Sequence, residues 1–197
     1  MFSIFASQSI WIMEDLIKRI SKAVGKKEVV KISSELVKNN VSIMELIDLT
    51  FYHEKEPAFR AAWILEQIAL NHQYLFIPWL SYFLSRLPHV SNESCKRHYA
   101  KIAEEYTRNF HSRKINNEIR SSLEQTDLEP AIEALFDWLI DPKTKIAVTA
   151  FAMETLYNLS FKFPWIKDEL EEQIHFLMKN GSAGIQSRGK KILAMLK

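Results

Sequence analysis

Neighbouring carboxylates are the side chains of this chain whose types could support acid–base catalysis. They occur as three adjacent pairs, Glu104-Glu105, Asp168-Glu169 and Glu171-Glu172. Acid–base catalysis needs two carboxyl groups that face one substrate, whereas adjacent residues on a helix point about 100° apart. Each pair therefore indicates a charged, solvated helix face rather than a catalytic pair.

The histidines and the single cysteine are the side chains that could ligate a transition metal. Cys95 and His98 stand three residues apart on one predicted helix, and His89 precedes them. However, no Cys or His pair repeats with the spacing of a zinc finger or of H-E-x-x-H. The nucleophile, phosphate-loop and dinucleotide motifs are also missing from the sequence. We therefore predict no catalytic residue, no metal and no cofactor.

The composition is typical of a globular protein with a sizeable core. Of the 197 residues, 47% are hydrophobic and 12% aromatic, and the net charge is only +2. Four Gly and six Pro residues leave no flexible linker, so we expect a single domain over residues 1–197. A balanced charge also argues against a general attraction to phosphate polymers.

The lone cysteine and the N-terminus bear on localisation. Cys95 has no second cysteine with which to form an internal disulfide, which favours a reducing compartment and hence the cytoplasm. Residues 1–12 are apolar but lack a charged leader region, and the charges of residues 14–19 interrupt any membrane span. Because an amphipathic pattern starts at Met13, we interpret residues 1–12 as an N-terminal extension, and whether it belongs to the native protein stays open.

Four stretches share one helical pattern in a matching register, with apolar or small residues at i, i+3, i+4 and i+7. These positions are Ala61, Ile64, Leu65 and Ile68; Tyr99, Ile102, Ala103 and Tyr106; Ala152, Thr155, Leu156 and Leu159; and Gly189, Ile192, Leu193 and Leu196. Such positions form one face of a helix, and four copies in one register indicate a stack of similar units.

Each patterned helix is preceded by another, which predicts four helix pairs and no strand. The pairs are residues 41–52 with 57–71, 74–87 with 92–111, 128–140 with 143–161, and 165–179 with 183–196. A shorter pair within residues 13–40 is expected to cap the N-terminus, and residues 115–125 are expected to form an inserted helix. Asp141-Pro142 and Thr126-x-x-Glu129 predict helix starts, and Asn180-Gly181 predicts a left-handed helix end.

The helix pairs resemble known repeats. LEPAIEALFDWLI, followed by Asp141-Pro142 and KIAVTAFAMETLYNL, is similar to a HEAT repeat. Together with FRAAWILE, SCKRHYAKIAEEY and FPWIKDEL, it resembles a family of short, uncharacterised bacterial HEAT-like proteins, with the similarity spanning about residues 13–197. The resemblance implies an all-α solenoid related to HEAT and ARM proteins and no assigned activity. Some family members carry an adenylosuccinate lyase label, but the Gly- and Ser-rich catalytic loop of that enzyme has no counterpart here.

The stacked second helices of such a solenoid line a concave surface, to which outward-facing residues would contribute. These binding candidates are Phe59, Trp63, Glu66, Arg97, Lys101, Glu104, Glu154, Tyr157 and Lys191. Their mixture of both charge signs with aromatic rings suits a protein or peptide partner, and we predict a non-catalytic scaffold. Whether Trp63 anchors a partner or packs against a neighbouring helix stays open.

The alternative function is DNA binding of the type found in the alkylpurine DNA glycosylases, which are among the HEAT-like bacterial proteins. The candidate phosphate contacts are Arg97, Lys101, Arg108, Arg113, Lys114, Arg120, Lys190 and Lys191, with Trp63 and Glu66 or Glu154 near the lesion. Three glutamates, Glu66, Glu104 and Glu154, interrupt this basic series. Nucleic acid is therefore the less favoured partner, and no membrane partner is expected.

Overall fold

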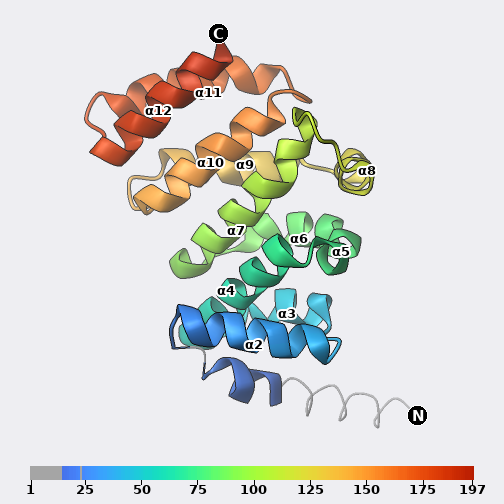
Figure 1. The fold of residues 1–197 in the computed structure, drawn as a ribbon. Coiled ribbons are helices and arrows are strands. Elements are labelled where there is room, and N and C mark those ends of the chain that lie inside the picture. Colours follow the sequence, from blue (N-terminus) through green and yellow to red (C-terminus); the bar gives the residue numbers. More distant parts are fainter. Residues whose placement is uncertain (1–14, 23) are drawn as a thin grey trace. The chain divides into compact units, whose positions relative to one another are not determined.

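The computed structural model describes residues 15–22 and 24–197, so the predicted extension over residues 1–12 lies outside the described part. The described residues form α-helices, short 3-10 helices and connecting turns, and they contain no strand (Figure 1). The predicted all-α, HEAT-like fold class is therefore confirmed. The chain divides into two compact units, Met1–Phe76 and Ile77–Lys197, which we describe separately. The single domain over residues 1–197 stays a prediction.

In the first unit, the neighbouring helices pack their apolar faces against one long helix. Residues 15–20 are helical and are followed by α2 (Lys26–Lys38), α3 (Ile43–Leu49), α4 (Lys55–Asn71) and the short α5 (Gln73–Phe76). Helix α4 packs against α2 and α3. Its four predicted core positions, Ala61, Ile64, Leu65 and Ile68, are all fully buried, as the periodicity predicts.

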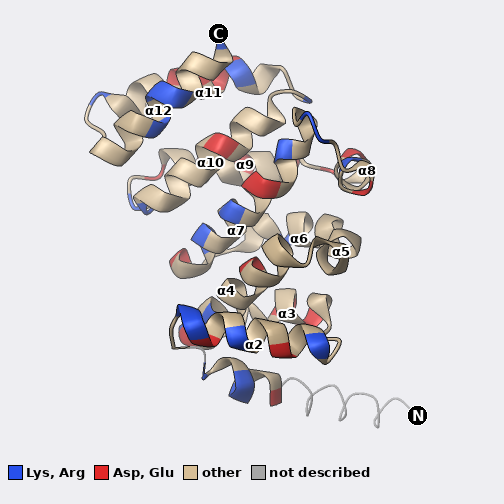
Figure 2. Cartoon of the chain, in the orientation of Figure 1, with Lys and Arg blue, Asp and Glu red and all other residues tan. Residues whose placement is uncertain are grey.

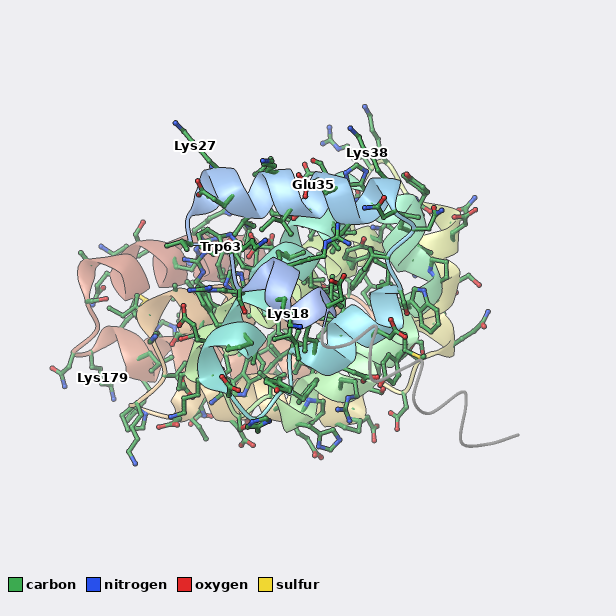
Figure 3. The ribbon with its side chains drawn as sticks, turned by 90° about the horizontal axis from the view of Figure 1, so that it is seen from below. Lys18, Lys27, Glu35, Lys38, Trp63 and Lys179 are labelled. Atoms are coloured by element: carbon green, nitrogen blue, oxygen red, sulfur yellow. The ribbon has the colours of Figure 1, made fainter. Side chains whose placement is uncertain are left out.

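Helix α2 ends in a motif that the sequence analysis did not use. Asn40 has a φ of 53°, and it is the only non-glycine residue in the described part with a positive φ. The amide of Val41 donates to the carbonyl of Leu36 at 3.0 Å, and the amide of Asn40 donates to Val37 at 3.1 Å. This is a Schellman motif, in which asparagine tolerates the left-handed conformation. The side chains of Lys27 and Lys38 on α2 point away from the other helices of the unit (Figure 3).

The second unit holds the remaining helices. They are η1 (Ile77–Trp79), α6 (Leu80–Arg86), η2 (Leu87–His89), α7 (Glu93–Thr107), η3 (Arg108–Phe110), α8 (Asn117–Gln125), α9 (Glu129–Ile140), α10 (Ile146–Leu159), α11 (Trp165–Met178) and α12 (Ala183–Leu196). Helix α8 lies within the stretch expected to form an inserted helix. The expected helix over residues 74–87 is instead broken by a 3-10 turn at Pro78, because proline cannot donate the helical hydrogen bond.

Helix α10 is the centre of the second unit. It packs against α7, α9, α11 and α12, and every residue from Ala152 to Leu159 is buried. A helix that is surrounded in this way is apolar on most of its circumference. On α7, Tyr99 is fully buried and stacks on Phe83 with ring centroids 4.5 Å apart. The predicted core positions of this unit are buried, apart from Leu193, which is half-buried.

Two of the predicted helix-capping motifs are wrong, although α9 itself begins within a residue of the predicted position. Asp141 terminates α9, and its Oδ1 accepts from the amide of Lys143 at 2.9 Å, so Asp141-Pro142 forms a turn four residues before α10 begins. Asp-Pro satisfies the demands of a turn as well as those of a helix start. The Thr126 hydroxyl donates to the carbonyl of Ser122 rather than capping α9, while Asp127 Oδ1 accepts from the amide of Glu129 at 3.1 Å.

The predicted left-handed end of α11 is also wrong. None of the glycines has a positive φ. Gly181 is required for a different reason: a Cβ added there would lie 2.5 Å from the carbonyl oxygen of Leu177 and 2.8 Å from Ile185 Cγ2. Glycine is therefore needed at position 181 because the chain there passes close to the end of α11.

We therefore expect Gly181→Ala to lower the free energy of unfolding by about 1–3 kcal/mol, as overpacking does, because a backbone carbonyl has to move. Gly184→Ala is the matched control, since its added Cβ would lie 3.3 Å from Ile146 Cγ2 and meets no backbone atom. There, the better helix propensity of alanine should leave stability unchanged or raised. Urea unfolding of both variants measures the difference, and equal losses would show that this steric interpretation is wrong.

Candidate functional site

Helices α7, α10 and α12 of the second unit carry most of the predicted binding residues, and we call the surface that these three helices and the turns directly after α7 and α10 form the second-helix face. Helix α7 carries charges of both signs, whereas the charged residue of α10 is the acidic Glu154 and those of α12 are the basic Arg188, Lys190 and Lys191 (Figure 2). Arg97 on α7 and Lys191 on α12 are exposed, and Lys101 on α7 is half-buried. The face therefore presents a mixed rather than a uniformly basic surface.

Glu154 lies at the middle of the second-helix face. Its side chain is only 8% exposed, and its Oε1 accepts hydrogen bonds from Lys191 Nζ at 2.9 Å and from Arg188 Nη1. Both cations come from α12, so this carboxylate joins α10 to α12. The prediction that Glu154 projects away from the core is wrong, because the side chains of α12 cover it.

The electrostatics keep Glu154 ionised. Burial by itself raises the pKa of this carboxyl, but the hydrogen bonds and positive charges of Lys191 and Arg188 outweigh it, so the pKa lies below its ordinary value. Burial and the charge of Glu154 raise the pKa of the neighbouring Tyr157 hydroxyl, although Lys191 opposes them. A permanently ionised, paired carboxylate is suited to hold two helices together and unsuited to donate a proton.

This arrangement gives a pH-dependent prediction. We expect Glu154→Gln to cost about 1–2 kcal/mol of unfolding free energy at pH 7, a partial loss because both cations remain partly exposed. Since the folded pKa is lowered, the contribution is complete above the unfolded pKa of about 4.3 and declines as the pH falls through the folded value. The difference between the native chain and the variant should therefore shrink below about pH 4.

Urea unfolding from pH 7 down to pH 3.5 measures this difference. Glu172→Gln on α11 is the control, because Glu172 is exposed and should show little effect at either end of the range. A Glu154→Gln penalty that stayed constant at every pH would contradict the ion-pair interpretation.

A second charged group lies on α7. Glu104 accepts a hydrogen bond from Arg108, and Glu105 Oε2 lies 3.0 Å from Arg108 Nη1. The Glu104 side chain is 14% exposed and that of Arg108 47% exposed. Arg108, the first residue of η3, is thus partly neutralised by the carboxylates of α7, while part of its side chain still faces solvent.

An aromatic group completes the second-helix face. His111 stacks on Phe161 with centroids 4.7 Å apart, and both rings lie 5.4 Å from Tyr157. Phe161 is 53% exposed, whereas Tyr157 is 8% exposed, so the prediction that Tyr157 faces outward is wrong and Phe161 is the accessible ring. Phe161 lies beyond the end of α10, where helical spacing no longer predicts which side chain faces outward, and no sequence signal indicated His111.

A buried amide holds His111 in place. Asn158, which is 2% exposed, donates from Nδ2 to the carbonyl of Glu104 at 3.0 Å and to Thr107 Oγ1 at 3.1 Å. Its Oδ1 lies 2.7 Å from His111 Nε2. Because Oδ1 can only accept, Nε2 carries the proton that forms this hydrogen bond. Asn158 therefore fixes both the position and the tautomer of His111.

The remaining predicted residues lie on α4 in the first unit. Phe59 and Trp63 are half-buried, with their rings tilted and 5.8 Å apart. Glu66 is only 2% exposed, so the expectation that it projects away from the core is wrong. Helix α4 is buried over a wide arc that includes both Leu65 and Glu66, which a one-face pattern does not reveal.

Comparison with known proteins bears on this arrangement. The family model described as a HEAT repeat domain matches residues 16–196. The chain belongs to the HEAT repeat domain family. No curated protein and no solved structure gives a match. The bacterial subfamily and its adenylosuccinate lyase label receive no support from these comparisons.

HEAT repeat domains are scaffolds that typically mediate protein interactions. In this HEAT repeat protein, several cations proposed for DNA backbone contact are engaged with carboxylates: Arg108 with Glu104, Arg120 with Glu124 at 2.5 Å, and Lys191 with Glu154. Arg97, Arg113, Lys114 and Lys190 are exposed. Local pairing thus reduces the positive potential available to phosphates.

Two of the three candidate metal residues of this HEAT repeat protein are buried, and the third, His89, is exposed. Cys95 is 0% and His98 1% exposed, and residues 15–22 and 24–197 contain no group of three or more His, Cys, Asp or Glu side chains arranged to hold a metal ion. Burial raises the pKa of the Cys95 thiol to about 12, which disfavours the thiolate that metals and electrophiles need. Within the same described residues, no helix has the length and apolar character needed to span a bilayer.

Proposed function

We propose that this HEAT repeat protein is a non-catalytic scaffold of the cytoplasm that binds a polypeptide partner through the second-helix face. The observation that supports this most directly is the stack of the exposed Phe161 on the half-buried His111, together with the ion-paired Glu154. Aromatic rings and arginines dominate binding energy at protein interfaces, and mixed charges select a partner with complementary ones.

The second-helix face is organised before a partner binds. Asn158 holds His111, and Glu154 holds Arg188 and Lys191, so these side chains have already lost part of their rotamer freedom. Binding of a partner would therefore cost less side-chain conformational entropy than binding to a surface whose side chains are not held. The exposed Arg97 and the half-buried Lys101 on α7 extend the face with further cations.

The absence of catalysis is part of the proposal. The carboxylates of the second-helix face, Glu104 and Glu154, are each held by cations. A general acid or base must exchange a proton with a substrate near neutral pH, and a carboxylate with a lowered pKa is a poor match for that role. These groups are better explained as the supports of a binding surface.

Peptides selected from a random phage-displayed library against the immobilised chain test the proposal. We expect selected peptides to bind the native chain and to lose roughly tenfold or more in affinity with Phe161→Ala, in line with the loss of an aromatic anchor. Lys101→Glu should weaken binding of the same peptides, and Trp63→Ala tests whether α4 contributes. Ile115→Ala is the control, because Ile115 is 55% exposed and lies outside the second-helix face.

Duplex DNA is measured in parallel to examine the alternative. Two results together would contradict the proposal and favour phosphate contacts: a DNA affinity that falls steeply as salt rises, and a peptide affinity that Phe161→Ala leaves unchanged. Circular dichroism of each variant confirms that the fold is retained.

A further inference from the structure

An apolar hollow lies between two loops of the second unit, and none of the residues that line it is among those named for the second-helix face. The loop from α9 to α10 forms one side and the end of α11 with its following loop forms the other, and the volume is about 320 Å³. Its apolar lining consists of Leu139, Ile140, Ile146, Phe176, Leu177 and Ile185. Three of these side chains are largely exposed: Ile140 (53%), Ile146 (51%) and Phe176 (66%). Exposed apolar side chains gathered around a hollow are typical of an interaction site.

The rim of this hollow is basic. Lys143, Lys145 and Lys179 are exposed, and the two loops that carry them lie at the same edge of the second unit (Figure 2). Lys179 Nζ lies 6.0 Å from the centroid of the Phe176 ring. The acidic side chain in the lining, Asp141, already accepts a hydrogen bond from the amide of Lys143. A ligand at this edge would therefore meet mainly positive charge.

The lining also contains an unused polar group. The hydroxyl of Thr144 is buried and has no hydrogen-bond partner among the described residues. A buried hydroxyl without a partner is costly, and a ligand that supplied a hydrogen bond would relieve that cost. The backbone of an extended peptide offers both donors and acceptors.

We propose that this hollow docks a segment of a partner protein that presents one bulky apolar side chain flanked by aspartate or glutamate. The apolar side chain fills the space between Ile146 and Phe176, and the acidic neighbours face Lys143, Lys145 and Lys179. The complementarity of charge favours an acidic segment over a basic one. This contact is independent of the second-helix face, so it holds whether or not the proposed function does.

Methyl NMR of the full chain, labelled at the isoleucine δ1 positions, tests the inference directly. The probe is an N-acetylated nonapeptide with one central leucine, two glutamates on each side and serine elsewhere. We expect its titration at 50 mM salt to shift the methyl signals of Ile140, Ile146 and Ile185 and to leave that of Ile115 unchanged. Raising the salt to 300 mM should weaken binding several-fold, because it screens the lysines.

Matched peptides and variants separate the parts of the inference. The peptide with alanine at the centre should lose roughly tenfold in affinity, and so should the original peptide against Phe176→Ala. Lys179→Glu should weaken binding severalfold, while the control Ile115→Ala should not.

Three outcomes would overturn it: no shifts at millimolar peptide, equal binding of a peptide with lysines in place of the glutamates, or shifts that depend on protein concentration alone. The last outcome would identify the hollow as a self-association surface instead.

Discussion

Leu156→Ala is expected to lower the free energy of unfolding by about 2–5 kcal/mol and the melting temperature by roughly 5–15 °C. Leu156 is fully buried on α10, which is enclosed by α7, α9, α11 and α12. Removing its side chain forfeits apolar burial and leaves a cavity that four surrounding helices are poorly able to close. Thermal and urea unfolding followed by circular dichroism measure both quantities.

Leu193→Ala is the matched control for this prediction. Leu193 occupies the same position of the helical pattern on α12, but it is only half-buried, so its truncation should cost clearly less. Leu65→Ala, at the corresponding position of α4 in the first unit, is fully buried and should cost as much as Leu156→Ala. Equal effects of Leu156→Ala and Leu193→Ala would contradict the expectation that the cost follows the depth of burial.

The helical pattern predicted the core residues correctly because the buried positions of a helix recur at a fixed local spacing. Ala61, Ile64 and Leu65 are buried where the period of the helix places them. The pattern describes one face of one helix, however, and says nothing of how far the neighbouring helices wrap around it. Glu154 and Tyr157 were predicted to face outward, but α10 is covered from several sides, including by α12.

Helix ends were harder to predict for a different physical reason. Asp-Pro satisfies both a helix start and a tight turn, and the choice at Asp141 depends on where α9 stops. A left-handed helix end was predicted at Asn180-Gly181, because asparagine and glycine both tolerate that conformation. The structure instead has it at Asn40, just after α2. Local residue types restrict the options, and packing selects among them.

The site itself depends on contacts that no local pattern encodes. His111 and Asn158 are 47 positions apart, and their hydrogen bond forms only because η3 and α10 pack together. Phe161 lies just beyond the end of α10, where the inward and outward register of a helix no longer applies. The helices that form the second-helix face were therefore predictable from the sequence, whereas the aromatic pair that we expect to anchor a partner was not.

Asn158→Leu is expected to cost about 2–4 kcal/mol of unfolding free energy, although leucine has a similar size. The substitution removes the donor to the Glu104 carbonyl and to Thr107 Oγ1, and it removes the acceptor for His111 at the packed contact between α7 and α10. The Glu104 carbonyl keeps the amide of Arg108, so the group that loses its principal partner is His111 Nε2. An unsatisfied buried polar group costs more than the hydrogen bond itself contributes. Urea unfolding measures the loss.

Thr155→Val on the same helix is the control for this loss. Thr155 is also fully buried, but its strongest hydrogen bond runs to the carbonyl of Phe151 within α10, at 2.8 Å, and this carbonyl is also a helical acceptor. We expect a cost of about 1 kcal/mol or less, since no group on another helix loses its principal partner. Comparable losses for the two variants would contradict the role of Asn158 as the link between α7 and α10.

The same variant connects the fold to the proposed binding surface. Without Asn158, His111 loses the acceptor that fixes its ring against Phe161, so the stack should loosen even in molecules that remain folded. In a double-mutant cycle, His111→Phe should weaken peptide binding less in the Asn158→Leu background than in the native chain, because the two residues act through one geometry. Additive effects on binding would show that Asn158 supports only stability and that the order of the aromatic pair does not matter for recognition.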